Sequence, residues 1–233
     1  MKVVILAGGK GTRLAEYTKT TPKPMVKVLN LPIIVHIMKH YAYYGHKDFI
    51  VAAGYKKNFI KDYFKKNQFG WKVSVVDTGL NTMTGGRIKR LKKIISEDTF
   101  LLTYGDGLSN VNIKKLLKFH KENSALVTLT AVRPPARFGS IKILNKKVRV
   151  FREKSTLNEG WINGGFFVME PKIFEYIKND SIFLEKEPLT KLGRSNKLFA
   201  FKHSGFWQCM DTIRDKEILE KILKKRKTWK QTF

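Results

Sequence analysis

Leu6-Ala7-Gly8-Gly9-Lys10-Gly11-Thr12-Arg13, close to the start of this 233-residue chain, has the pattern of a buried strand that runs into a glycine-rich loop. Residues 3–6 are Val, Val, Ile and Leu, a continuous apolar run typical of a strand covered on both faces. The three glycines let backbone N–H groups turn towards an anion with no Cβ in the way. Arg13 and Lys23 flank the loop. These features predict a phosphate-binding loop at the end of the first strand.

The loop matches neither of two common nucleotide-binding motifs. The Gly-Lys-Ser/Thr ending of the Walker A motif is absent, and the dinucleotide motif G-x-G-x-x-G fails because Leu14 follows Gly9-x-Gly11-x-x. A tight turn without a ligand is the alternative interpretation of the glycines. The two flanking cations favour a phosphate site.

Strand-like and helix-like segments alternate over the first 125 residues, by apolar spacing and by Pro and Gly signals. The predicted helices cover residues 32–44, 58–66, 86–95 and 113–121, and the predicted strands cover residues 3–6, 48–53, 72–76 and 100–103. Repeated strand–helix units predict an α/β fold with a doubly wound, mostly parallel, Rossmann-like sheet. Ligands bind beyond the carboxyl ends of such strands, the edge where we expect Arg13, Asp106 and the turn at residues 77–79.

The pattern changes after residue 125. Strands are predicted at 127–132 and 163–169, with a hairpin of residues 139–144 and 148–153 between them, and no helix separates these strands. We therefore expect a mixed β portion over one end of the sheet. Because no linker, repeat or low-complexity segment divides the chain, the sequence predicts a single domain over residues 1–233.

The chain carries 46 Lys and Arg against 19 Asp and Glu, a formal net charge of +27. Such a charge raises the alternative of a nucleic-acid-binding protein. The lysines, however, are spread over nearly every amphipathic segment, and only residues 88–93 and 223–227 are dense enough for a patch. We therefore expect small anionic substrates and no nucleic-acid partner.

Membrane and secretory signals are absent from the sequence. There is no run of 18 apolar residues, and Met1-Lys2 leads directly into the first strand. We expect a cytoplasmic protein with no membrane partner. The single cysteine, Cys209, cannot form an internal disulfide and is interpreted as a small buried apolar residue rather than a nucleophile.

Two aspartates follow apolar runs. Asp106 stands between Gly105 and Gly107, and Asp211 lies within Phe206-Trp207-Gln208-Cys209-Met210-Asp211-Thr212. One or two carboxylates, completed by phosphates and waters, commonly hold Mg²⁺ in nucleotide enzymes. Each residue also has a structural alternative, Asp106 as a turn residue and Asp211 as the N-cap of a helix over residues 213–223. The pair favours a metal site.

Taken together and in order, these motifs resemble those of the sugar-phosphate nucleotidyltransferases, over nearly the whole chain. The glycine loop with Pro22-Lys23-Pro24-Met25 is typical of the family as a whole. Met83-Thr84-Gly85-Gly86-Arg87 and the 206–212 stretch resemble its cytidylyl branch. The further matching segments are 77–79, 88–90, 104–107, 137–139, 153–154, 162–167 and 187–189.

The resemblance implies that the phosphate of a sugar 1-phosphate, first of all α-D-glucose 1-phosphate, attacks the α-phosphorus of CTP and releases pyrophosphate. Mg²⁺ is the implied cofactor, and no general base is needed because the nucleophile is already ionised. The implied catalytic residues are Arg13, Lys23, Asp106 and Asp211, with both aspartates as metal ligands. The implied nucleotide-binding residues are Leu6, Gly8, Gly9, Gly11, Thr12, Arg13, Lys23, Thr84, Gly85, Gly86 and Arg87. The implied sugar-phosphate-binding residues are Tyr104, Gly139, Glu153, Lys154 and Asn163.

The resemblance also divides the chain into a nucleotide-binding half, residues 1–125, and a sugar-phosphate-binding half, residues 126–233. Three points stay open. The segment at residues 65–71 is shorter than in better-studied cytidylyltransferases, which leaves the oligomeric state open, a homo-oligomer included. Another nucleotide or another sugar 1-phosphate would leave the glycine loop and both aspartates unchanged. A glycosyltransferase would share the architecture, but would normally show Asp-x-Asp where this chain has Gly-Asp-Gly.

Overall fold

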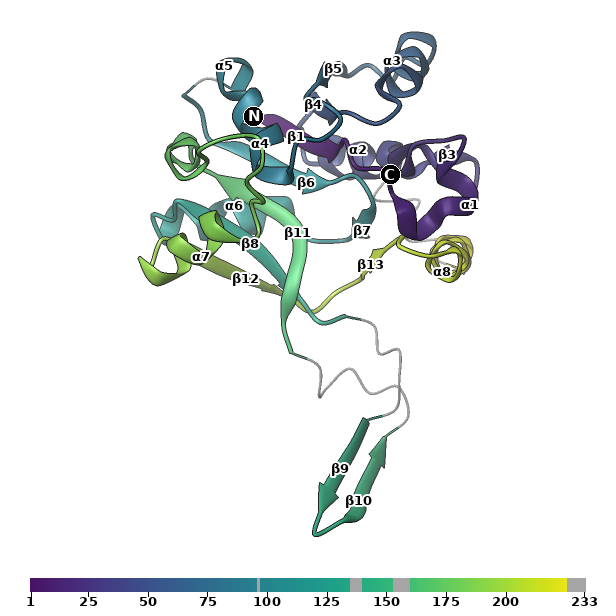
Figure 1. Ribbon diagram of the computed structural model, residues 1–233, viewed down its shortest axis with the longest axis vertical. Coiled ribbons are helices and arrows are strands. Elements are labelled where there is room, and N and C mark those ends of the chain that lie inside the picture. The colour runs from purple at the N-terminus through teal and green to yellow at the C-terminus, as the bar shows by residue number, and fades with distance from the viewer. Residues whose placement is uncertain (96, 135–139, 153–159, 226–233) are drawn as a thin grey trace.

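The computed structural model describes residues 1–95, 97–134, 140–152 and 160–225. Within these residues, seven strands form one sheet in the order β12-β8-β11-β6-β1-β4-β5 (Figure 1). The strands are β1 (Lys2–Ala7), β4 (Asp48–Ala53), β5 (Lys72–Asp77), β6 (Phe100–Tyr104), β8 (Val127–Val132), β11 (Ile162–Met169) and β12 (Leu198–His203). β1, β4, β5 and β6 are parallel. The predicted mostly parallel α/β sheet is confirmed.

The mixed portion continues this sheet and does not lie over one end of it. β11 is antiparallel to both β6 and β8, and Phe166 of β11 lies opposite Thr103 of β6. β12, which the sequence pattern did not reveal, is parallel to β8. The second half of the chain therefore extends the sheet that begins with the glycine loop.

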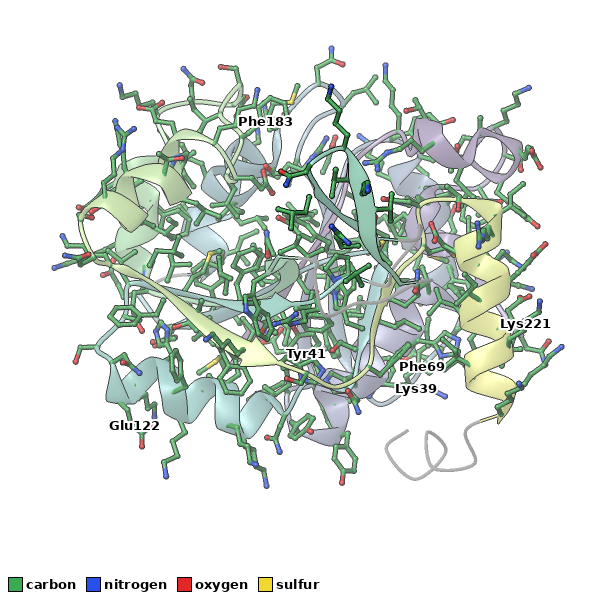
Figure 2. The ribbon with its side chains drawn as sticks, turned by 90° about the horizontal axis from the view of Figure 1, so that it is seen from below. Lys39, Tyr41, Phe69, Glu122, Phe183 and Lys221 are labelled. Carbon is green, nitrogen blue, oxygen red and sulfur yellow. The ribbon has the colours of Figure 1, made fainter. Side chains whose placement is uncertain are left out.

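Alternating residues of the strands face two separate apolar cores. In β1, Val3, Ile5 and Ala7 contribute to one core, and Val4 and Leu6 to the other. The first core is closed by α2 (Ile33–Tyr43), α3 (Lys57–Lys66), α6 (Ile113–Glu122) and α8 (Ile213–Lys225). The second is closed by α4 (Thr84–Arg90), α5 (Lys92–Ile95), η4 (Pro171–Tyr176) and α7 (Glu187–Arg194). Figure 2 shows Tyr41 of α2 in the interior and Lys221 of α8 at the periphery.

The predicted helix over residues 86–95 is divided, and it starts earlier than expected. α4 begins at Thr84 because the segment at residues 180–184 lies against its N-terminus. The N–H of Met83 donates to the carbonyl of Asp180 (2.8 Å), and the N–H of Gly86 to that of Ile182 (3.2 Å). These bonds satisfy N–H groups that a helix start leaves unpaired.

Short elements connect the sheet to the loops around it. β7 (Gly107–Ser109) pairs antiparallel with β13 (Trp207–Cys209), and β2 (Lys27–Val28) with β3 (Leu31–Pro32). β9 (Ser140–Leu144) and β10 (Lys147–Arg152) form the predicted hairpin, drawn apart from the central sheet in Figure 1. The loop after β1 contains η1 (Thr12–Leu14), α1 (Ala15–Thr18) and η2 (Lys23–Met25). Among the described helices, none is long and apolar enough to cross a membrane.

Candidate active site

A cavity of about 560 Å³ opens beyond the carboxyl ends of β1 and β6. This is the edge of the sheet where the sequence predicted the ligands. The predicted site residues on its wall are Leu6, Gly8, Gly9, Gly11, Arg13, Lys23, Thr84, Arg87, Tyr104, Asp106 and Asp211. Other wall residues include Thr82, Met83, Phe183, Trp207 and Cys209.

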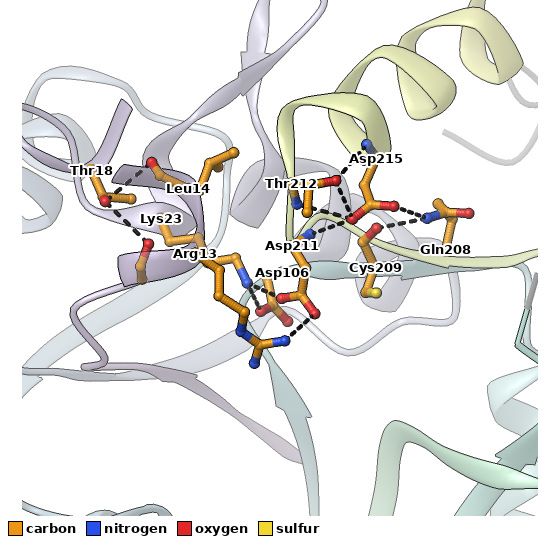
Figure 3. Close-up of polar contacts among 11 residues, drawn as sticks. Arg13, Leu14, Thr18, Lys23, Asp106, Gln208, Cys209, Asp211, Thr212 and Asp215 are labelled. Atoms are coloured by element: carbon orange, nitrogen blue, oxygen red, sulfur yellow. Dashed lines mark hydrogen bonds and ion pairs between the residues drawn. The ribbon is translucent and has the colours of Figure 1, made fainter. Parts of the chain in front are cut away.

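Four charged side chains meet in this cavity and form what we call the ionic cluster: Arg13, Lys23, Asp106 and Asp211 (Figure 3). The Lys23 Nζ lies 2.6 Å from Asp106 Oδ2 and 2.6 Å from Asp211 Oδ1. Arg13 Nη1 donates to the other oxygen of Asp211, at 2.8 Å. The Lys23 side chain is 12% exposed, whereas that of Arg13 is 76% exposed. The cluster therefore holds two cations and two carboxylates, and its formal charges cancel.

Backbone pairing brings the two aspartates together from distant parts of the chain. β7, which follows Asp106, pairs with β13, which precedes Asp211. The N–H of Met210 also donates to the backbone carbonyl of Asp106, at 2.9 Å. These bonds hold both carboxylates near the edge of the sheet, where Lys23 reaches them from η2.

The structural alternative for Asp211, a helix cap, is wrong. Thr212 and Asp215 form a capping box at the start of α8, because the Thr212 hydroxyl accepts from the Asp215 N–H (3.2 Å). The Asp215 carboxylate in turn accepts from the Thr212 N–H (2.9 Å) and from the Asp211 N–H (3.1 Å). With Asp215 in this role, the Asp211 side chain is directed at Lys23 and Arg13. Asp106 likewise directs its carboxylate to Lys23.

The charge of Lys23 is maintained by its partners. Burial by itself would lower the pKa of the amine, but the charges and hydrogen bonds of Asp106 and Asp211 outweigh it and raise the pKa above its usual value. Lys23 is therefore an ammonium group held between two carboxylates.

The donor set of the ionic cluster fits a divalent cation. The two carboxylates already converge on one cationic centre, the Lys23 ammonium. In the described part of the chain, no group of three or more His, Cys, Asp or Glu side chains could hold a metal ion. An ion bound by Asp106 and Asp211 would therefore need further oxygen ligands from phosphate and water, the pattern usual for Mg²⁺.

Arg87 supports the glycine loop by hydrogen bonds to backbone carbonyls, that of Gly8 among them. Its guanidinium is buried and lies so close to Gly8 that a Cβ there would be 2.1 Å from Nη1. Burial, followed by the charge of Arg90, lowers the pKa of Arg87. The guanidinium donates to the Thr78 hydroxyl (2.8 Å) and to the carbonyl oxygens of Gly8 (3.0 Å), Ala53 (3.3 Å), Gly79 (2.6 Å) and Leu80 (3.3 Å).

Gly11 is required by the turn of the same loop. It has a φ of 64°, and a Cβ there would lie 2.9 Å from the Lys23 Cβ. Thr18 holds the turn through bonds from its hydroxyl to the carbonyls of Gly11 (3.1 Å) and Leu14 (3.2 Å) (Figure 3). Thr12, predicted to contact the triphosphate, is exposed in η1 beside Arg13.

Gly85 and Gly86 do not belong to the cavity wall, although the family resemblance implied that they line the base. Both are buried against the 180–184 segment. A Cβ on Gly86 would lie 2.5 Å from the Asp180 backbone, and one on Gly85 would lie 2.7 Å from the Ile182 carbonyl. These glycines allow the close approach of two backbones, and the neighbours Thr84 and Arg87 reach the cavity.

A second polar group, which we call the hydroxyl cluster, consists of Thr84, Tyr104, Asn163 and Glu185. The Glu185 carboxylate accepts from the Thr84 hydroxyl through Oε2 (2.6 Å) and from the Tyr104 hydroxyl through Oε1 (2.6 Å). The Asn163 amide donates to the Tyr104 hydroxyl, at 3.1 Å. Sequence analysis did not identify Glu185 as a site residue. The one feature of the sequence that could have indicated it is that acidic residues are few in this chain.

Three predicted sugar-phosphate residues, Gly139, Glu153 and Lys154, lie outside the described residues. Cys209, interpreted as a buried apolar residue, is half-buried on the cavity wall. Burial raises the pKa of its thiol to about 11, with a contribution from the nearby aspartates. The thiol is therefore protonated at neutral pH, which agrees with the prediction that Cys209 is no nucleophile.

Comparison with known proteins defines the class of this fold and site. Residues 2–213 match the family model described as nucleotidyl transferase. The chain therefore belongs to the nucleotidyl transferase family.

Within this family, the chain is similar over its full length to particular proteins. The chain is 46% identical to glucose-1-phosphate cytidylyltransferase of Salmonella typhimurium, over 99% of both proteins. It is 40% identical to a probable glucose-1-phosphate cytidylyltransferase of Bacillus subtilis, over 99% of this chain and 97% of the relative. Among solved structures, HddC from Yersinia pseudotuberculosis superimposes with a TM-score of 0.77 at 27% identity, over 95% of this chain and 99% of HddC.

Proposed function

We propose that this protein joins CTP to α-D-glucose 1-phosphate and forms CDP-glucose and pyrophosphate, with Mg²⁺ as the cofactor. The names of the relatives from Salmonella typhimurium and Bacillus subtilis support the choice of substrates. The observation that carries the proposal is that Lys23 forms ion pairs with both Asp106 and Asp211 in the cavity that the glycine loop also lines. This arrangement gathers the charges that a triphosphate and a metal ion need.

In the proposed reaction, a phosphate oxygen of the sugar 1-phosphate attacks the α-phosphorus of CTP. The new P–O bond forms as the bond to the β-phosphate breaks, and pyrophosphate leaves with the electron pair. The bound metal supplies positive charge to the phosphate oxygens. Because the nucleophile is already an anion, the protein needs no general base and acts by positioning and charge neutralisation.

The nucleotide is assigned to the half of the chain at residues 1–125. Gly8, Gly9, Gly11 and Thr12 offer their backbone to the triphosphate, with Leu6 beneath them. Arg13 and Lys23 turn from the aspartates to the phosphates, where their charge opposes the charge that develops around the α-phosphorus. Thr84 faces the base, while Arg87, Gly85 and Gly86 hold this wall in place from behind.

The sugar phosphate is assigned to the half at residues 126–233, together with Tyr104. Tyr104 lies on the cavity wall, and its hydroxyl is bonded to Asn163. Gly139, Glu153 and Lys154 complete this side as the family resemblance implies, with Lys154 on the sugar phosphate. Asp106 and Asp211 are the residues that would hold the metal ion.

Release of pyrophosphate from CTP, UTP, dTTP, ATP and GTP, each with a panel of sugar 1-phosphates, tests the proposal. CTP with glucose 1-phosphate and Mg²⁺ is expected to give the fastest turnover, and a chelator is expected to stop it. Much faster turnover with UTP or dTTP across several sugar phosphates would show that the cytidylyl assignment is wrong.

A further inference from the structure

Glu185 is the centre of the hydroxyl cluster, and it lies just before α7. Its two carboxylate oxygens accept from residues on two different elements, Thr84 at the start of α4 and Tyr104 at the end of β6. Both O–H···O distances are 2.6 Å, in the short range of bonds to an ionised carboxylate. Both Thr84 and Tyr104 line the cavity of the candidate active site.

These bonds fix where the two hydroxyl protons point. A hydroxyl has one proton and two lone pairs, and a carboxylate can only accept. The Thr84 and Tyr104 protons are therefore both directed at Glu185 and away from the cavity.

The remaining capacity of each hydroxyl is that of an acceptor. The Thr84 oxygen already accepts from the Leu184 N–H at 2.9 Å, which leaves one lone pair. The Tyr104 oxygen accepts from the Asn163 amide at 3.1 Å, which also leaves one. The side of the cavity between Thr84 and Tyr104 thus offers acceptors to a substrate and has no hydroxyl proton to give.

Cytosine and uracil differ at the position that such an acceptor would distinguish. Cytosine carries an amino group at C4 that donates hydrogen bonds, whereas uracil carries a carbonyl oxygen there that only accepts. An acceptor on the cavity wall binds the amino group of cytosine and repels the carbonyl oxygen of uracil. A hydroxyl that is free to rotate would serve both bases, because it can donate or accept.

We propose that Glu185 is a positioning residue that sets nucleotide specificity: by taking the hydroxyl proton of Thr84, it makes this hydroxyl an obligate acceptor that favours the amino group of cytosine over the carbonyl of uracil. The inference rests on the proposed function, because it assumes that the base of the nucleotide meets Thr84. It adds a residue that never touches the base and acts through one that does.

The test is the ratio of kcat/KM for CTP to kcat/KM for UTP, measured with glucose 1-phosphate for the wild type and for Glu185→Ala. The ratio is expected to fall in Glu185→Ala by on the order of 10-fold, the scale of one hydrogen bond. Glu187→Gln is the matched control, because this acid lies two residues away and pairs with Lys191 on the surface of α7. Its ratio is expected to equal that of the wild type.

Two further variants keep the test decisive if Glu185→Ala folds poorly. Glu185→Leu removes both carboxylate oxygens, so the Thr84 hydroxyl loses the acceptor of its proton, and the ratio is expected to fall here as well. Thr84→Val removes the hydroxyl itself, and adding Glu185→Ala to Thr84→Val is expected to leave the ratio unchanged. A purely structural role would lower the melting temperature of the Glu185 variants without changing the ratio.

The possible outcomes separate this inference from the proposed function. A wild type that prefers CTP and a Glu185→Ala variant that keeps the same ratio within twofold would overturn the inference and leave the proposed function standing. A further fall of the ratio on adding Glu185→Ala to Thr84→Val would overturn it too, because Glu185 would then act by another route. A wild type that prefers UTP would overturn both.

Discussion

Lys23 and Arg87 are two cations on the wall of the same cavity, but their partners are of opposite kinds. Lys23 binds two carboxylates, Asp106 and Asp211, which are ligands suited to a metal ion. Arg87 binds backbone carbonyls and the Thr78 hydroxyl, which belong to the fold itself. The family resemblance implied that both cations contact the nucleotide.

This difference between the partners of Lys23 and of Arg87 indicates which cation can change partners. An arriving triphosphate and metal ion would compete for both sides of the Lys23 pairs, since the phosphate attracts the ammonium and the metal attracts the carboxylates. The partners of Arg87 carry no net charge, and releasing them would take from the Gly79 and Leu80 carbonyls the donor that Arg87 supplies, at about 1–3 kcal/mol each. We infer that Lys23 is exchanged between partners during the reaction, whereas Arg87 stays in place as support for the loop.

Loss of either carboxylate that binds Lys23 should have the largest effect. Asp106→Ala and Asp211→Ala are each expected to lower kcat/KM by at least ~10²–10³-fold, because each removes a proposed metal ligand and one of the two carboxylate partners of Lys23. Thermal unfolding should remain cooperative, because neither side chain caps a helix or belongs to the apolar core.

Asp62→Ala, on the exposed face of α3, is the matched control and should keep full activity. Near-wild-type, metal-dependent activity of either cavity variant would remove that aspartate from the proposed metal site. A collapse of folding would instead indicate a structural role.

On the Arg87 side, the expected effect is on stability. Arg87→Lys keeps the positive charge but loses the planar fork that reaches several carbonyls at once. A single amine cannot reach all the acceptors of the fork, and the Gly79 or Leu80 carbonyl then loses its donor. We therefore expect a loss of about 1–3 kcal/mol and a fall in melting temperature of at least about 2 °C. The KM for CTP should rise because the glycine loop loses its support.

Arg90→Lys is the comparison for that measurement. Arg90 also uses its fork, on Asp180, but this pair is about half exposed and such pairs contribute little. If Arg87→Lys and Arg90→Lys melted at the same temperature as the wild type, Arg87 would not be the support that we describe.

The smallest effect is expected at Thr212, which follows the proposed metal ligand Asp211. Thr212→Ala removes the cap of α8 and should cost about 1 kcal/mol in the free energy of unfolding measured with urea. Activity should fall far less than in Asp211→Ala, one residue earlier. Thr212→Ser keeps the capping hydroxyl and should restore the stability. A loss of activity in Thr212→Ala equal to that in Asp211→Ala would mean that the two residues act as one unit.

The fold was largely predictable because strand–helix alternation and apolar periodicity are local signals. β12 and α7 were not predicted, since β12 is only partly buried and α7 spans only 8 residues. The ionic cluster could be predicted in outline, because glycines and acids at strand ends are visible in the sequence. The salt bridges of Lys23 were not, because they join residues 83 and 188 positions apart.

The predicted contacts of Gly85 and Gly86 also show what a local sequence pattern cannot predict. A glycine pair at a helix start is compatible with close approach of a ligand or of another backbone, and the sequence does not say which. Here the neighbour is the 180–184 segment, which Glu185 directly follows in the chain. A pattern within five residues cannot reveal a partner about a hundred residues away.

Binding of Mn²⁺ to the nucleotide-free protein, followed by electron paramagnetic resonance, tests the exchange of Lys23 most directly. If the ammonium occupies the place between the carboxylates, Lys23→Met should bind Mn²⁺ at least ~10-fold more tightly than the wild type, equal to ~1.4 kcal/mol, although its turnover falls. Lys61→Met, on the exposed side of α3, should bind the ion as the wild type does. Equal or weaker Mn²⁺ binding by Lys23→Met would contradict the account, because the lysine would then not compete with the metal for Asp106 and Asp211.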